Sequence, residues 1–168
     1  MITNEELDTH FVSPRMREYF RKKLPKIDQY ELNIRIQELL KYLNMAVYSS
    51  GGIPFTSDID EVWHLWILET QEYAALCEKL YGGRFMHHSS SEYLSLAQND
   101  DGGGNGDFQR ALEILMSYVL NYGDFERRRI RYWPVADLLY QHFNEDLRKT
   151  NDWLKMKIKQ CSAMEEAV

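Results

Sequence analysis

The strongest constraint on the fold is a run of apolar residues at three- and four-residue steps between positions 28 and 48. Asp28 is a typical helix N-cap, and Glu31 follows it at the third position. The apolar residues then recur at helical spacing: Leu32, Ile36, Leu39, Leu40, Leu43, Ala46 and Val47. This pattern predicts an amphipathic helix with one buried stripe, which the Ser-Ser-Gly-Gly segment at 49–52 ends.

The same periodicity predicts helices along the rest of the chain. Thr3 with Glu6, and Ser13 before Pro14, are start signals for two short helices, the second of which should end before Pro25. A long helix is predicted over 58–81, antiparallel to the 28–48 helix because the connection is short. Further helices are expected after Ser89 to about position 97, from Asp107 to 122, and from 134 to about 161 with a bend near 150.

We therefore expect an all-α fold of about six or seven helices in one compact, bundle-like domain over 1–168. A chain of 168 residues fits one domain, and 44% hydrophobic with 13% aromatic residues supply a core. The segment 99–106, Asn-Asp-Asp-Gly-Gly-Gly-Asn-Gly, is predicted to be a flexible surface loop. It lacks the alternating ligands of a calcium loop and the lysine of a phosphate loop.

Charge and hydropathy exclude several functional classes. The formal net charge of −6 makes nucleic acid an unlikely partner, and the basic run at 127–131 is short and follows acidic residues. No apolar run approaches the roughly 20 residues of a membrane helix, and the acidic N-terminus does not resemble a signal peptide. Cys77 and Cys161 are too few for a disulfide scaffold, so we predict a cytoplasmic protein.

The residues most suited to chemistry lie between positions 58 and 88, where three of the five histidines occur. On a helix, Asp60 lies four residues and Glu61 three residues before His64, so either carboxylate can share a face with this imidazole. His87 and His88 follow the Gly-Gly stop at 82–83. If this segment folds back along the helix, one or both approach His64.

Imidazole and carboxylate are ligands for zinc or non-haem iron, so we predict a divalent metal site. A di-iron bundle would need further carboxylates, and the sequence has no second Glu-x-x-His step. Two interpretations without a metal stay open. His64 can hydrogen-bond to Asp60 while His87 and His88 cap carbonyls, or His64 can act in acid–base chemistry alone.

His142 is a secondary candidate ligand. The sequence places it on the apolar stripe of the last helix, between Leu139 and Phe143. A single histidine on such a face is more often a core residue. Cys77 is on the stripe of the 58–81 helix, where core packing is a better interpretation than nucleophilic catalysis.

The 60–88 stretch resembles a family signature. It contains Asp60-Glu61-Val62-Trp63-His64, Ile67-Leu68-x-Thr70, Tyr73, Cys77, Gly83-x-Phe85 and His87-His88. It is similar to small bacterial proteins called glycine-rich domain-containing, or glycine-rich domain-containing protein-like. Many of those proteins carry a Cys- and Gly-rich tail, whereas this chain has only the internal glycines at 102–104. The resemblance implies that these residues act as a group, and it implies no particular reaction.

Two classes of function follow. In the first, the protein binds a metal through His64, His87, His88, Asp60 and Glu61, as a metal-dependent enzyme or an accessory subunit of one. Its catalytic residues and reaction are not defined by the sequence. In the second, it is a non-enzymatic binding protein, such as an inhibitor, an immunity protein or a phage-borne adaptor, in which the histidine cluster is structural. The acidic surface would then favour a basic protein partner.

Overall fold

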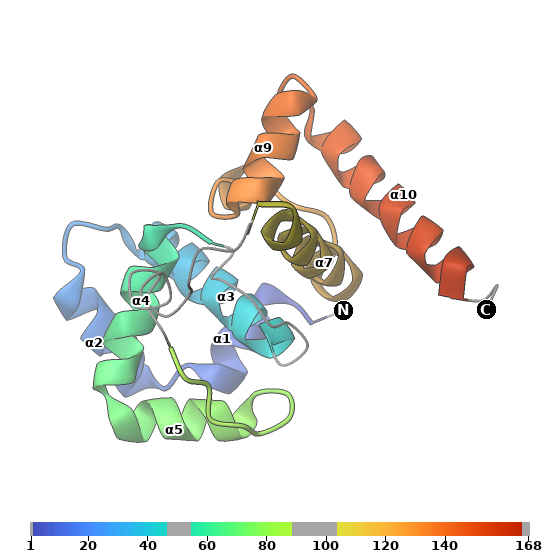
Figure 1. Cartoon of the computed structure of the whole chain (residues 1–168). Helices are drawn as coiled ribbons and strands as arrows, with labels where there is room; N and C mark the ends of the chain where they lie inside the picture. Colours follow the sequence, from blue (N-terminus) through green and yellow to red (C-terminus); the bar gives the residue numbers. More distant parts are fainter. Residues whose placement is uncertain (1, 47–54, 89–103, 166–168) are drawn as a thin grey trace.

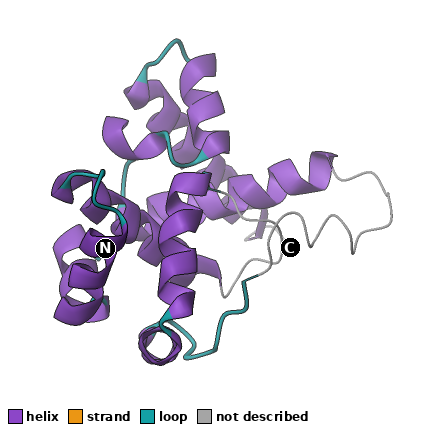
Figure 2. Cartoon of the chain, turned by 90° about the vertical axis from the view of Figure 1, so that its left-hand side faces the viewer, coloured by secondary structure: helices purple, strands orange, loops and turns teal. Residues whose placement is uncertain are grey.

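The computed structural model describes residues 2–46, 55–88 and 104–165, and in these ranges every regular element is a helix (Figure 2). The all-α prediction is therefore confirmed. The expected count of six or seven helices is too low, because these residues form nine. Two of the extra helices arise where a predicted long helix divides, and another is the four-residue α8 (Arg127–Ile130). None of the helices found is long and apolar enough to cross a membrane.

The N-terminal helices begin at the predicted caps. Thr3 and Glu6 form the reciprocal capping box of α1 (Asn4–Phe11). The Ser13 side chain accepts from the backbone of the first turn of α2 (Pro14–Lys23), and this helix ends before Pro25. Local chemistry is sufficient to set these boundaries, because each cap satisfies backbone N–H groups that have no partner inside the helix.

Helix α3 (Gln29–Met45) occupies the centre of the molecule and contacts α1, α2, α4 and α7 (Figure 1). Asp28 caps its first turn, as predicted. It has more than one buried stripe, because Glu38 and Lys41 are also buried. The Glu38 carboxylate accepts from Lys41 Nζ at 2.8 Å, Arg129 Nη1 at 2.7 Å and Trp133 Nε1 at 2.8 Å.

The predicted 58–81 helix is wrong as a single element. It divides into α4 (Ser57–Leu68) and α5 (Thr70–Lys79), and Glu69 between them has φ −93° and ψ 70°. Helices α3 and α4 are in contact, but α4 crosses α3 and the expected antiparallel pairing is not found (Figure 1). Arg35 holds the crossing by pairing with Asp58 at 3.1 Å and Glu61 at 3.6 Å.

The C-terminal half forms a second group of contacting helices, α7 (Gly104–Tyr122), α8, α9 (Pro134–His142) and α10 (Leu147–Glu165). Residues 104–106 belong to α7, so the predicted 99–106 loop is wrong at its end, and Asp107 lies within the helix. Residues 99–103 and the short helix predicted after Ser89 lie outside the described residues.

The last predicted helix also divides, and the break comes earlier than the expected bend. Helix α9 ends at His142 and α10 begins at Leu147, while Asn144 and Glu145 between them have φ values of 54° and 60°. Thr150 and Asn151 are buried inside α10. His142 is exposed at the end of α9, so its predicted place on a buried stripe is wrong.

Candidate metal centre

Asp60 and His64 lie one turn apart on the solvent side of α4, whose inner face is formed by buried Ile59, Val62 and Trp66. His64 Nδ1 is 2.8 Å from the Asp60 backbone oxygen and 3.3 Å from its Oδ2. A carbonyl oxygen can only accept, so Nδ1 carries the proton in this hydrogen bond. In the neutral ring, His64 Nε2 then carries the lone pair, and this is the form of imidazole that binds metals.

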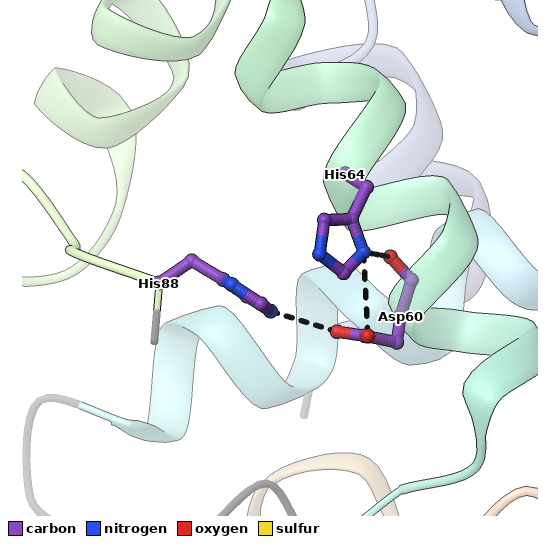
Figure 3. Close-up of side chains that lie close together, drawn as sticks. All are labelled: Asp60, His64 and His88. Atoms are coloured by element: carbon purple, nitrogen blue, oxygen red, sulfur yellow. Dashed lines mark hydrogen bonds and ion pairs between the residues drawn. The ribbon is translucent and has the colours of Figure 1, made fainter. Parts of the chain in front are cut away.

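His88 reaches the same carboxylate from a different part of the chain (Figure 3). It lies in the non-helical segment 84–88, and its Nε2 is 2.8 Å from Asp60 Oδ1. The rings of His64 and His88 are 4.4 Å apart between centroids. Asp60 therefore contacts both imidazoles, one through each side of its carboxylate.

These three side chains form a group that can hold a cation. One ligand atom from each of Asp60, His64 and His88 lies within 4.8 Å of the others. Around a tetrahedral ion with bonds of about 2.0–2.1 Å, neighbouring ligand atoms are about 3.3 Å apart. Rotation of the half-exposed His64 side chain would shorten its distances to the other two ligands. Two histidines and one carboxylate suit both zinc and non-haem iron.

The structure places the other predicted ligands elsewhere. The Glu61 carboxylate pairs with Arg35, and the exposed His87 ring packs on Phe85 with centroids 5.1 Å apart. His142 is a neighbour of Phe143 at the end of α9. The group within ligand distance thus contains Asp60, His64 and His88, and it does not contain Glu61, His87 or His142.

The turn after α5 brings His88 to α4. Gly82 and Gly83 have φ values of 86° and 58°, and a side chain at either position would be strained. The Tyr73 hydroxyl donates to the Met86 carbonyl at 2.7 Å and accepts from Trp63 Nε1 at 3.0 Å. The Trp63 and His88 rings in turn form a T-shaped contact, with centroids 4.5 Å apart.

Residue spacing on a single predicted helix does not bring Tyr73 into contact with Trp63. In an unbroken helix, residues 63 and 73 would lie about 15 Å apart along the axis. The hydrogen bond between Trp63 and Tyr73 therefore requires the break at Glu69. No Gly or Pro marks that break, so the sequence offers no local signal for it.

The centre is buried on one side and open on the other. The side chain of His88 is 8% exposed, that of Asp60 27% and that of His64 51%. His64 lines a shallow surface depression of about 550 Å³ together with Leu65 and Leu68. A larger cavity of about 880 Å³ lies between α1, α3, the end of α5 and α7, and it does not include the three ligands.

Comparison with known proteins gives a family match. A family model described as UCP032817-like matches residues 3–120, more than half of the chain and all of the candidate centre. Searches of curated proteins and of solved structures each found no match. No named relative supports the glycine-rich domain resemblance, which stays a prediction, as do the expected protein partner and the absence of a nucleic-acid role.

Proposed function

We propose that this chain, which belongs to the UCP032817-like family, binds a divalent metal ion through Asp60, His64 and His88. The observation that supports this most directly is the convergence of three ligand-type atoms, from two separate segments, within 4.8 Å. Zinc and non-haem iron are the two metals that such a ligand set favours.

The ligand count favours a site with an open position. Structural zinc sites have four protein ligands, whereas catalytic ones have three and leave the fourth position to water or substrate. The half-exposed His64 and the adjacent depression give that position access to solvent. A zinc ion there would activate water and an iron ion would support oxygen chemistry, so we propose a metal-dependent enzyme or an accessory subunit of one.

The tautomer of His64 supports the proposal. Ligand histidines usually donate their second ring N–H to a backbone carbonyl or a carboxylate, which orients the ring. His64 Nδ1 makes this kind of contact with Asp60. His88 Nε2 faces Asp60 Oδ1 at 2.8 Å, and a proton on this nitrogen would have to move to Nδ1 or be released before the nitrogen binds an ion.

Elemental analysis and metal titration test the proposal. Protein purified without a histidine tag should contain close to one equivalent of metal, and chelation should lower its melting temperature. His64→Ala and His88→Ala should each lose the metal, and the double variant should lose little more, because either loss opens the site.

His87→Ala is the matched control, because His87 is adjacent to His88 but lies outside the ligand group. It should keep the metal content and the chelator response of the wild type. Absence of stoichiometric metal from the wild type, with no response to added zinc or iron, would refute the proposed function.

A further inference from the structure

We infer that Tyr73 is the positioning residue of the proposed metal centre and that it sets the place of the His88 imidazole. The inference rests on the proposed function, because it assigns a role in holding a ligand. Tyr73 is buried in α5, and its hydroxyl hydrogen-bonds to Trp63 and Met86, which are not ligands. Its hydroxyl has one partner on the segment that carries His88 and one on the helix that carries Asp60 and His64.

The first contact acts through the backbone. Segment 84–88 is neither helix nor strand, so no regular hydrogen-bond pattern holds it in place. The Tyr73 hydroxyl donates to the Met86 carbonyl at 2.7 Å, two residues before His88. The Tyr73 ring also meets the Phe85 ring edge-on, with centroids 5.3 Å apart. These contacts hold the chain against α5 just before the ligand.

The second contact acts through a side chain. Trp63 Nε1 donates to the Tyr73 hydroxyl at 3.0 Å, and this hydrogen bond orients the indole. The indole stands nearly perpendicular to the His88 ring, with an interplanar angle of 87° and centroids 4.5 Å apart. The Trp63 indole, which packs against His88, is therefore hydrogen-bonded to the same Tyr73 hydroxyl.

The contacts through Met86 and through Trp63 both affect the position of His88 Nε2. With Met86 and Trp63 held, His88 Nε2 lies 2.8 Å from Asp60 Oδ1. Without the Tyr73 hydroxyl, the Met86 carbonyl and the indole N–H both lose this partner, so segment 84–88 loses a hydrogen bond to α5 and the buried indole N–H is left unpaired. Groups that hydrogen-bond to metal ligands typically contribute 10–100-fold to metal affinity, and we expect an effect in this range from Tyr73, which acts through Met86 and Trp63.

Tyr73→Phe tests this assignment, because it removes the hydroxyl and keeps the ring that meets Phe85. Zinc affinity, measured by competition with a chromogenic chelator, should fall 10–100-fold. The visible spectrum of the Co²⁺-loaded variant should also differ from that of the wild type, since the spectrum reports ligand geometry. A loss of stability alone would not change that spectrum in protein that circular dichroism shows to be folded.

Tyr42→Phe is the matched control. Tyr42 is also buried, and its ring meets Trp63 from another side at 5.7 Å between centroids. This variant should keep the zinc affinity and the Co²⁺ spectrum of the wild type. If Tyr73→Phe does not fold, Trp63→Phe tests the same chain of contacts, because it removes the indole N–H and should also weaken zinc binding and alter the spectrum.

The outcomes separate the two proposals. If the wild type binds zinc and the Tyr73→Phe protein binds it equally well with an unchanged Co²⁺ spectrum, the role of Tyr73 is refuted and the metal site stands. If Tyr73→Phe is unfolded, equal zinc binding and an unchanged Co²⁺ spectrum in Trp63→Phe refute the role of Tyr73 in the same way. If the wild type binds neither zinc nor Co²⁺, the metal site itself is refuted, and the role of Tyr73 with it.

Discussion

At the scale of single residues, Glu38 is a buried charge with several polar partners. Its side chain is fully buried and receives hydrogen bonds from two cations, Lys41 and Arg129, and from the Trp133 indole. Burial lowers the pKa of Lys41, and the Glu38 carboxylate opposes that effect. One carboxylate thus compensates two buried positive charges where α3 meets α8 and α9.

Glu38→Gln should destabilise the protein strongly. The amide keeps the shape of the side chain but removes the negative charge. Buried Lys41 then loses its ion pair with Glu38, and buried Arg129 keeps the ion pair with the exposed Glu126 at 3.3 Å. Breaking a buried ion pair in this way costs about 3–5 kcal/mol in the free energy of unfolding. Urea unfolding monitored by circular dichroism measures the change.

Glu18→Gln provides the comparison, because Glu18 pairs with Arg21 at 3.1 Å on the surface. Its loss should change the free energy of unfolding by less than about 1 kcal/mol. Equal effects of the two substitutions would contradict the importance assigned to the buried charges.

Residue-level prediction succeeded where spacing along one helix decides the contact. The four-residue step from Asp60 to His64 placed both on one face, and the structure confirms this. Spacing did not predict which carboxylate, Asp60 or Glu61, lies beside His64. The structure decides it, because the Glu61 carboxylate pairs with Arg35 on another helix. Nor did spacing reveal that Glu38 is buried, because its partner Arg129 lies 91 residues away in sequence.

At the scale of elements, Asn151 joins α10 to the turn before α8. Its side chain accepts from the Phe125 N–H at 2.8 Å and donates to the Phe125 carbonyl at 3.0 Å. The amide thus pairs both backbone groups of one buried residue, as a neighbouring strand would.

Asn151→Ala should lower the free energy of unfolding by about 2–4 kcal/mol, because it leaves a buried N–H and a buried C=O without partners. Thermal and urea unfolding both report this loss. In Asn121→Ala, only an exposed hydrogen bond to the Ser117 carbonyl is lost, and stability should change little. A small effect at Asn151 would indicate that water replaces its amide.

The starts of the first three helices were predictable, whereas the start of α7 and two breaks within predicted helices were not. Thr3, Ser13 and Asp28 cap their helices through contacts within one turn, so the sequence alone identifies them. At Glu69 the apolar spacing continues without Gly or Pro, and the change of direction between α4 and α5 depends on tertiary packing. The 143–146 break contains Asn144, a residue that tolerates positive φ, and this was the available signal.

At the scale of the whole molecule, the free energy of unfolding should depend on pH in the alkaline range, because both groups of helices contain tyrosines with a raised pKa. Burial raises the pKa of Tyr42 in α3 and of Tyr122 in α7 to about 12, from an ordinary value of 10.0. Burial raises the pKa of Tyr118 as well. Between these pH values an unfolded chain releases protons that the folded chain keeps, so the free energy of unfolding must fall as pH rises.

We therefore expect stability to decrease from about pH 10 to pH 12, at about 1.4 kcal/mol per pH unit for each such tyrosine. Lys41 has a lowered pKa and acts in the opposite direction, but only until pH passes the ordinary lysine value of about 10.4. Urea unfolding at several alkaline pH values, with tyrosinate absorbance followed in parallel, measures the effect. Titration of all eleven tyrosines near pH 10 in folded protein would contradict it.

The ligands of the candidate centre come from two segments of the chain, so a bound ion would close a loop between them. Asp60 and His88 are 28 residues apart, and all of α5 lies between them. An ion bound by both would be a cross-link that closes this loop and removes conformations from the unfolded ensemble. For a covalent link the chain-entropy relation gives about 3–4 kcal/mol at this loop length. A metal here would thus tie the fold of α4, α5 and segment 84–88 to the supply of that metal, whatever chemistry the ion performs.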